Sequence, residues 1–101
     1  MSVTIAEGGL GSRGAALGQT TINLSTRSTT IRIAPGQSPY ERSVTLYHVI
    51  IEATALQAKP TPPMVLDLSE TEFDMLAYMA QEQFGPATVV NLNKLLAILG
   101  F

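Results

Sequence analysis

The sequence predicts an α+β fold in which an N-terminal β-hairpin or short sheet packs on two to three amphipathic helices. Residues 19–34 alternate apolar and polar side chains at a period of two, which is typical of half-buried strands. Residues 70–83 and 88–99 instead repeat apolar side chains at intervals of three and four, which is typical of helices. With 101 residues the chain has the usual size of one domain. We expect a single domain over residues 1–101, with a Gly-rich loop and hairpin in 1–36, a helix or long strand in 38–58, and a short strand and two helices in 64–101.

The first third of the chain is predicted to supply the strands. Val3 to Ala6 can form a short strand, and residues 8–18, which hold five of the eight glycines, favour a loop. A polar break at Thr26-Arg27 then divides residues 19–34 into the two strands of a hairpin. We expect Ile22, Leu24, Ile31 and Ile33 on its inner face, and Thr21, Asn23, Thr30 and Arg32 on its outer face.

Residues 38–58 are compatible with two structures, of which the helix is favoured. Ser38 can accept a bond from a free N–H group, Pro39 suits the first helical position, and Glu41 completes a capping box. The alternative is one long buried strand over Ser43 to Ala55, because β-branched residues dominate that segment. In the helix, a narrow polar stripe of Glu41, Thr45, His48, Glu52 and Lys59 would oppose an apolar face of Tyr40, Leu46, Tyr47, Ile50, Ile51 and Ala53.

The last third of the chain is predicted to be mainly helical. A short strand over Met64 to Leu68 leads to a capping box, Ser69 to Glu72, which opens a helix that extends to about Gln83. A final helix over Thr88 to Leu99 follows, with Gly100 as its terminator. The residues expected to face inward are Phe73, Leu76, Ala77, Ala80 and Phe84 in the first helix, and Val89, Leu92, Leu95, Leu96 and Leu99 in the second.

The composition indicates an oligomer. Hydrophobic residues make up 46% of the chain and charged residues 14%, against a usual charged share of about 25%. Large exposed apolar patches are rare on monomers, so we expect a homo-oligomer in which the apolar faces of residues 40–58 and 88–99 supply both the core and the subunit contact. The absence of cysteine excludes disulfides, thiolate metal sites and cysteine nucleophiles. No stretch approaches the ~20 apolar residues of a membrane span, and the first residues contain no secretory signal, so we expect a cytoplasmic protein without membrane contact.

The candidate ligand site lies in the first half of the chain, where all four basic residues are arginines. Gly9 to Gly14 has the glycine spacing of dinucleotide-binding loops, but a strand pattern follows it where that fold needs a helix. Backbone N–H groups of such a loop can still form a concave anion site, and arginine suits phosphate or carboxylate groups. We therefore expect a phosphorylated, nucleotide-like molecule or an acidic protein surface to bind here. The expected ligand-binding residues are Gly9, Gly11, Ser12, Arg13, Gly14, Arg27 and Arg32.

No set of residues suggests catalysis or metal binding. His48 is the single histidine and pairs with Glu52 one turn later, but no nucleophile or second histidine completes a reactive constellation. The acidic residues between Asp67 and Asp74 suit the start of a helix and lack the ligand spacing of a calcium loop. We therefore expect a non-enzymatic binding protein with no cofactor and no metal. The alternative is a structural or regulatory module that acts only through protein–protein contact.

A further pattern lies in residues 66–80, which resemble the start of the winged-helix output domain of two-component response regulators. The residues that carry the resemblance are Leu68, Thr71, Glu72, Phe73 and Leu76. It implies, as a second alternative, a winged-helix-like DNA-binding fragment. A recognition helix presents Arg or Lys to phosphates and bases, whereas residues 66–101 contain Lys94 alone against five acids. The charge therefore predicts that nucleic acid is not a partner.

Overall fold

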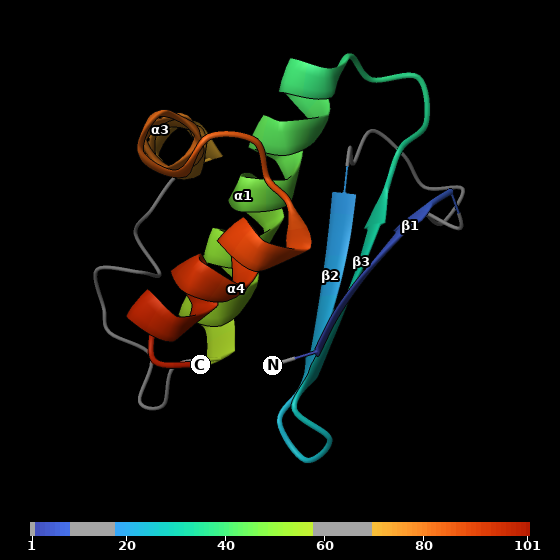
Figure 1. The fold of residues 1–101 in the computed structure, drawn as a ribbon, viewed down its shortest axis with the longest axis vertical. Helices are drawn as coiled ribbons and strands as arrows, with labels where there is room; N and C mark the ends of the chain where they lie inside the picture. Colours follow the sequence, from blue (N-terminus) through green and yellow to red (C-terminus); the bar gives the residue numbers. More distant parts are fainter. Residues whose placement is uncertain (1, 9–17, 58–69) are drawn as a thin grey trace.

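The computed structural model describes residues 2–8, 18–57 and 70–101, and every structural statement below refers to these ranges. A three-stranded sheet is followed by three helices that all lie on one face of it, so the predicted α+β class is confirmed (Figure 1). The predicted strand over 64–68 lies outside the described residues. The elements are β1 (Ser2–Glu7), β2 (Gly18–Asn23), β3 (Ser28–Ile33), α1 (Pro39–Gln57), α3 (Glu70–Phe84) and α4 (Val89–Ile98).

The sheet has the order β1-β3-β2, with β3 in the centre. β2 and β3 form the predicted antiparallel hairpin, in which Thr21 pairs with Thr30. β1 pairs with β3 in parallel, and Thr4 lies on the other side of the same Thr30. The inner face carries Ile31 and Ile33, which are buried as expected, and the outer face carries the predicted polar residues in exposed positions.

The turn of the hairpin corrects one prediction. Leu24 was expected on the inner face, but the ladder ends at Asn23 and Leu24 lies in the turn, 52% exposed. The Asn23 carboxamide oxygen accepts bonds from the N–H groups of Ser25 and Thr26. This local bonding competes with continued strand pairing, which explains why the turn begins two residues earlier than the alternation suggests.

Residues 39–57 form a helix, so the helical alternative is the correct one. Ser38 Oγ accepts a bond from the Glu41 N–H at 3.2 Å, as the capping box predicts. Two β-branched residues of α1, Thr45 and Val49, pack against the sheet, and a Cβ on Gly18 of β2 would lie 2.8 Å from the Val49 side chain. Thr45 was expected on the polar stripe, but it is buried in this contact and its hydroxyl donates to the Gln37 side chain at 2.7 Å.

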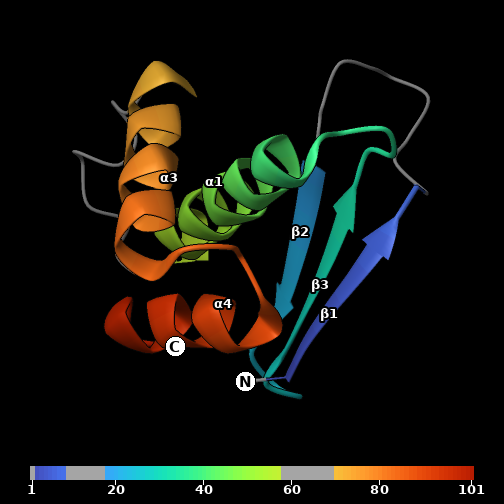
Figure 2. The same ribbon diagram turned by 45° about the horizontal axis from the view of Figure 1, so that its top comes forward.

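α3 and α4 complete the core around α1. In Figure 2, α1 lies between the sheet and α3, while α4 lies beside α1 and reaches β1. Gly85 and Gly100 adopt positive φ after α3 and α4, so both predicted helix ends are confirmed. No helix within the described ranges is long and apolar enough to cross a membrane. The core consists of Ile31, Ile33, Val44, Leu46, Tyr47, Val49, Ile50, Ala77, Ala80, Ala87, Leu92, Leu95 and Leu96.

Four predicted inward positions on the helices are wrong. Leu76, Val89 and Leu99 are each more than a third exposed, although the helical pattern placed them inward. Tyr40 was expected on the apolar face of α1 but is about half exposed, with its ring stacked against Tyr78 of α3. The helices therefore carry more apolar side chains than the core can bury, and the remaining ones face solvent.

Candidate functional site

The predicted anion site is described only in part. Gly9, Gly11, Ser12, Arg13 and Gly14 lie outside the described residues. Arg27 and Arg32 are described: Arg27 lies in the turn just before β3, and Arg32 lies near the far end of that strand. The five steps between them, most of them along extended chain, correspond to about 16 Å. Arg27 occupies the hairpin turn at a φ of 51° and donates from Nη2 to the Phe101 carbonyl at 2.9 Å. The structure therefore does not bring these two arginines together into one site.

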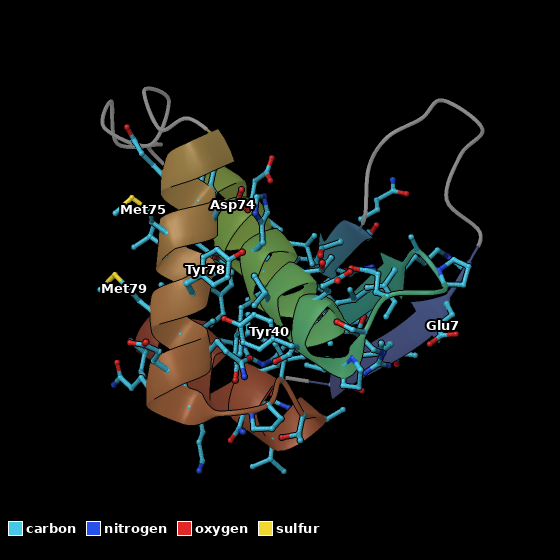
Figure 3. The ribbon with its side chains drawn as sticks, turned by 90° about the horizontal axis from the view of Figure 1, so that it is seen from above. Glu7, Tyr40, Asp74, Met75, Tyr78 and Met79 are labelled. Carbon is cyan, nitrogen blue, oxygen red and sulfur yellow. The ribbon has the colours of Figure 1, made fainter. Side chains whose placement is uncertain are left out.

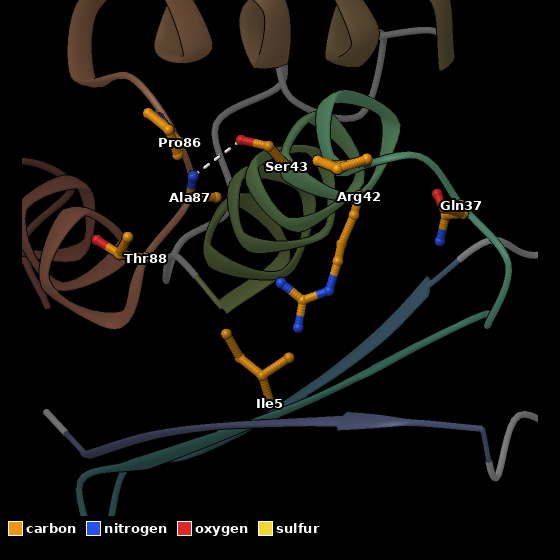
Figure 4. A pocket seen from close by; sticks show the side chains of 8 residues that line it. Ile5, Gln37, Arg42, Ser43, Pro86, Ala87 and Thr88 are labelled. Carbon is orange, nitrogen blue, oxygen red and sulfur yellow. Dashed lines mark hydrogen bonds between the residues drawn. The ribbon is translucent and has the colours of Figure 1, made fainter.

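A cleft of about 460 Å³ opens between β1, the start of α1 and the connection from α3 to α4 (Figure 4). Arg42 reaches into it from α1, above Ile5 of β1. Sequence reasoning did not select Arg42 as a site residue, because it follows a helix cap and has no motif around it. The cleft is lined by Ile5, Gln37, Pro39, Arg42, Ser43, Pro86, Ala87 and Thr88.

The polar groups of this cleft already have partners. Arg42 Nε lies 3.8 Å from Glu7 Oε1, so an incoming anion would have to compete with a carboxylate. Ser43 Oγ accepts a bond from the buried Ala87 N–H at 2.8 Å and donates to Gln81 Oε1. These bonds join α1 to α3 and to the start of α4. The geometry therefore favours a structural role for the polar lining.

His48 joins α1 to α3. Its Nε2 atom lies 3.0 Å from Glu52 Oε2, as the helical spacing predicts, and its Nδ1 atom lies 2.7 Å from Asp74 Oδ1 of α3. The side chain is only 14% exposed, and its ring packs near Phe73, so it does not form the simple surface pair that the sequence suggested. With a carboxylate at each ring nitrogen, the imidazolium is the form that can donate both bonds. This ring is held as a structural bridge, which argues against a role as a general base.

The described residues offer no other chemical centre. Among them, no group of three or more His, Cys, Asp or Glu side chains could hold a metal ion. Burial raises the pKa of Tyr47, whose hydroxyl donates to the Gly85 carbonyl at 2.7 Å inside the core. Tyr47 is fully buried, so it also serves packing.

The most distinctive surface consists of exposed apolar side chains on the helices. Met75 and Met79 of α3 point away from α1 into solvent (Figure 3) and are 60% and 61% exposed. Val90 and Ile98 of α4 are 63% and 67% exposed. On the sheet side, Leu24 in the turn is the one large apolar side chain with comparable exposure among the described residues. Sequence reasoning anticipated surplus apolar surface from composition but assigned it to residues 40–58 and 88–99, and it missed α3.

Two stripes on this surface differ in charge. We define the α3 stripe as Glu72, Met75, Met79 and Glu82, which follow one another at intervals of three or four on one side of the helix. We define the α4 stripe as Val90, Lys94 and Ile98, spaced four residues apart. α3 contains four acidic residues and no basic one, whereas residues 87–101 contain Lys94 and no acidic residue.

No family model, curated protein or solved structure matches this chain. The resemblance of residues 66–80 to winged-helix output domains therefore gains no support from these comparisons.

Proposed function

We propose that this protein is a non-enzymatic binding protein that acts through protein–protein contact and associates with further copies of itself through the outer faces of α3 and α4. One observation carries the proposal. Seven large apolar side chains of these two helices are more than a third exposed: Met75, Leu76, Tyr78, Met79, Val89, Val90 and Ile98.

The hydrophobic effect favours association through these exposed side chains. Burial of a side chain such as Met, Val or Ile contributes about 1.5–3 kcal/mol relative to full exposure. Large exposed apolar surface is typical of an interaction site. The low charged share of 14% supports the same conclusion, because few charges are present to keep this surface separate from other molecules.

The experiment is a measurement of mass in solution by sedimentation and light scattering across the micromolar range. We expect a multiple of the 10.8 kDa chain mass. Met79→Glu should shift the particle toward one chain, because it places a carboxylate in the centre of the α3 surface. Thr30→Glu is the matched control, since it adds the same charge at an exposed position on the outer face of the sheet. Its mass should equal that of the wild type.

Two results would overturn the proposal. A particle of 10.8 kDa at all concentrations would show that the exposed apolar surface does not drive association. Equal dissociation by Met79→Glu and Thr30→Glu would show that added charge, and not the helical surface, causes the effect. Circular dichroism of each variant shows whether the fold persists.

A further inference from the structure

We infer that copies of this chain join head to tail, with the α3 stripe of one copy against the α4 stripe of the next. The inference rests on the proposed self-association and names the two surfaces that meet. It follows from the exposure, the spacing and the opposite charge of the two stripes.

The α3 stripe combines two apolar side chains with acidic ends. Met75 and Met79 lie one turn apart and are the most exposed large apolar side chains of α3. Glu72 precedes them by three residues and Glu82 follows by three, and both are exposed. Methionine is flexible and adapts to an apolar partner, while the two carboxylates favour a partner that carries positive charge.

The α4 stripe has the complementary composition. Val90 and Ile98 are the two most exposed large apolar side chains of the described residues, and Lys94 lies between them at the same helical spacing. The eight steps from Val90 to Ile98 span about 12 Å, and the ten steps from Glu72 to Glu82 span about 15 Å. The α4 stripe therefore fits within the length of the α3 stripe, and the long side chain of Lys94 can extend toward an acidic end.

A contact between identical stripes is less favourable. When a two-fold axis passes through one stripe, that stripe meets its own copy, so two α3 stripes would bring Glu72 and Glu82 of one copy close to acids of the other. Two α4 stripes would place Lys94 against Lys94 at the axis. Like charges held at an interface weaken it and act against that pairing. The mixed contact places the base of one stripe opposite the acids of the other.

This arrangement has a structural consequence that a dimer joined by two identical stripes lacks. Each copy keeps one unused α3 stripe or α4 stripe after the first contact, so further copies can add until a ring closes. If the rotation between copies does not close, the product is a filament.

The test uses two variants, each with one damaged stripe. Met79→Glu damages the α3 stripe, and Ile98→Glu damages the α4 stripe. We expect each variant alone to be a single chain, and an equal mixture of the two to form a particle of two chains and no larger species. The reason is that the mixture contains one intact α4 stripe and one intact α3 stripe, which can meet once.

Each of the other possible results points to a different contact or to none. A monomeric wild type would reject the proposed function itself, before the question of surfaces arises. Self-association of Ile98→Glu at the wild-type mass would indicate a contact between two α3 stripes, and the same result for Met79→Glu would indicate two α4 stripes. Two monomeric variants whose mixture stays monomeric would also reject the head-to-tail contact, while the proposed self-association would stand.

A charge exchange tests the role of Lys94 independently of the apolar residues. Lys94→Glu should weaken association about two- to fivefold, in line with an exposed ion pair. Adding Glu82→Lys to the same chain should restore part of that loss, because it re-creates opposite charges across the contact. Thr30→Glu on the outer face of the sheet is the control and should leave association unchanged. Equal effects of Lys94→Glu and Thr30→Glu would reject the specific charge pairing.

Discussion

The outer face of the sheet and the outer faces of α3 and α4 both face solvent, yet they are built from opposite residue types. The register of the sheet aligns Thr4, Thr30 and Thr21 in one row across its outer face. Short hydroxyl side chains of this kind bond readily to water and cover the backbone of the sheet. On the helical side, methionine, valine and isoleucine occupy the equivalent exposed positions. The comparison shows that a low charged share need not leave a whole surface apolar, because uncharged polar residues can be concentrated on one side.

The largest expected effect on the free energy of unfolding is the difference between a buried and an exposed position of α4. Leu92→Ala should lower the free energy of unfolding by about 2–5 kcal/mol, because the side chain is fully buried and its removal leaves a cavity. Ile98→Ala on the same helix should change it by less than about 0.5 kcal/mol, as is usual at exposed sites. Urea unfolding of both variants in a Met79→Glu background, in which we expect no association, provides the measurement. Similar losses of unfolding free energy at the two positions would mean that the Ile98 side chain stabilises the fold of the single chain.

A smaller effect on stability is expected from the loss of polar contacts, and it should differ between the buried contacts of Ser43 and the exposed contact of Thr26. Ser43→Ala should reduce stability by about 1–3 kcal/mol, because it leaves the buried Ala87 N–H and the Gln81 side chain without their partner. Thr26→Ala removes the contact between the Thr26 and Ser28 hydroxyls, which are 2.7 Å apart in the exposed hairpin turn. Water can replace that bond, so the loss should be within about 0.5 kcal/mol. The measurement is chemical denaturation. A larger loss of stability in Thr26→Ala than in Ser43→Ala would contradict the expected order.

The smallest effect is a dependence of stability on alkaline pH. Burial raises the pKa of Tyr47 above its ordinary value of 10.0, so ionisation is easier in the unfolded chain. The stabilising contribution is fully present below the unfolded pKa and is lost as the pH rises through the folded pKa. Thermal unfolding of Tyr47→Phe should therefore show a weaker decline above about pH 10 than the wild type. Tyr78→Phe, at a half-exposed ring, is the control and should retain the wild-type decline.

Local signals in the sequence predicted the elements well. The hairpin follows from alternation over residues 19–34. The start of α1 follows from Ser38, Pro39 and Glu41, and Ser38 Oγ accepts a bond from the Glu41 N–H. Gly85 and Gly100 mark helix ends because positive φ suits glycine. Each of these features depends on residues a few positions apart, so the pattern contains the necessary information.

Contacts between distant segments account for what the sequence did not reveal. The parallel pairing of β1 with β3 joins Thr4 to Thr30, and nothing within either segment specifies the partner. The bond from His48 to Asp74 depends on how α3 crosses α1. The exposure of Met79 likewise depends on how much of α3 the other helices cover. The glycine and arginine pattern suggested one anion site, but Arg27 and Arg32 are separated by the length of β3, a distance that composition alone does not show.

The parallel pairing of β1 with the central strand also implies an order of assembly. β2 and β3 are joined by a turn of four residues, so their pairing closes a short loop. The pairing of Ser2 with Ser28 closes a much longer loop, because all of β2 lies between them in the sequence. Closing the longer loop costs more chain entropy and slows the step that depends on it. Val3 and Ile5 are only half-buried, so β1 gains less from docking than β3 does. In amide hydrogen exchange, β1 should therefore release its protons to solvent through local opening, while the amides of β3 that pair with β2 exchange only when the hairpin itself opens.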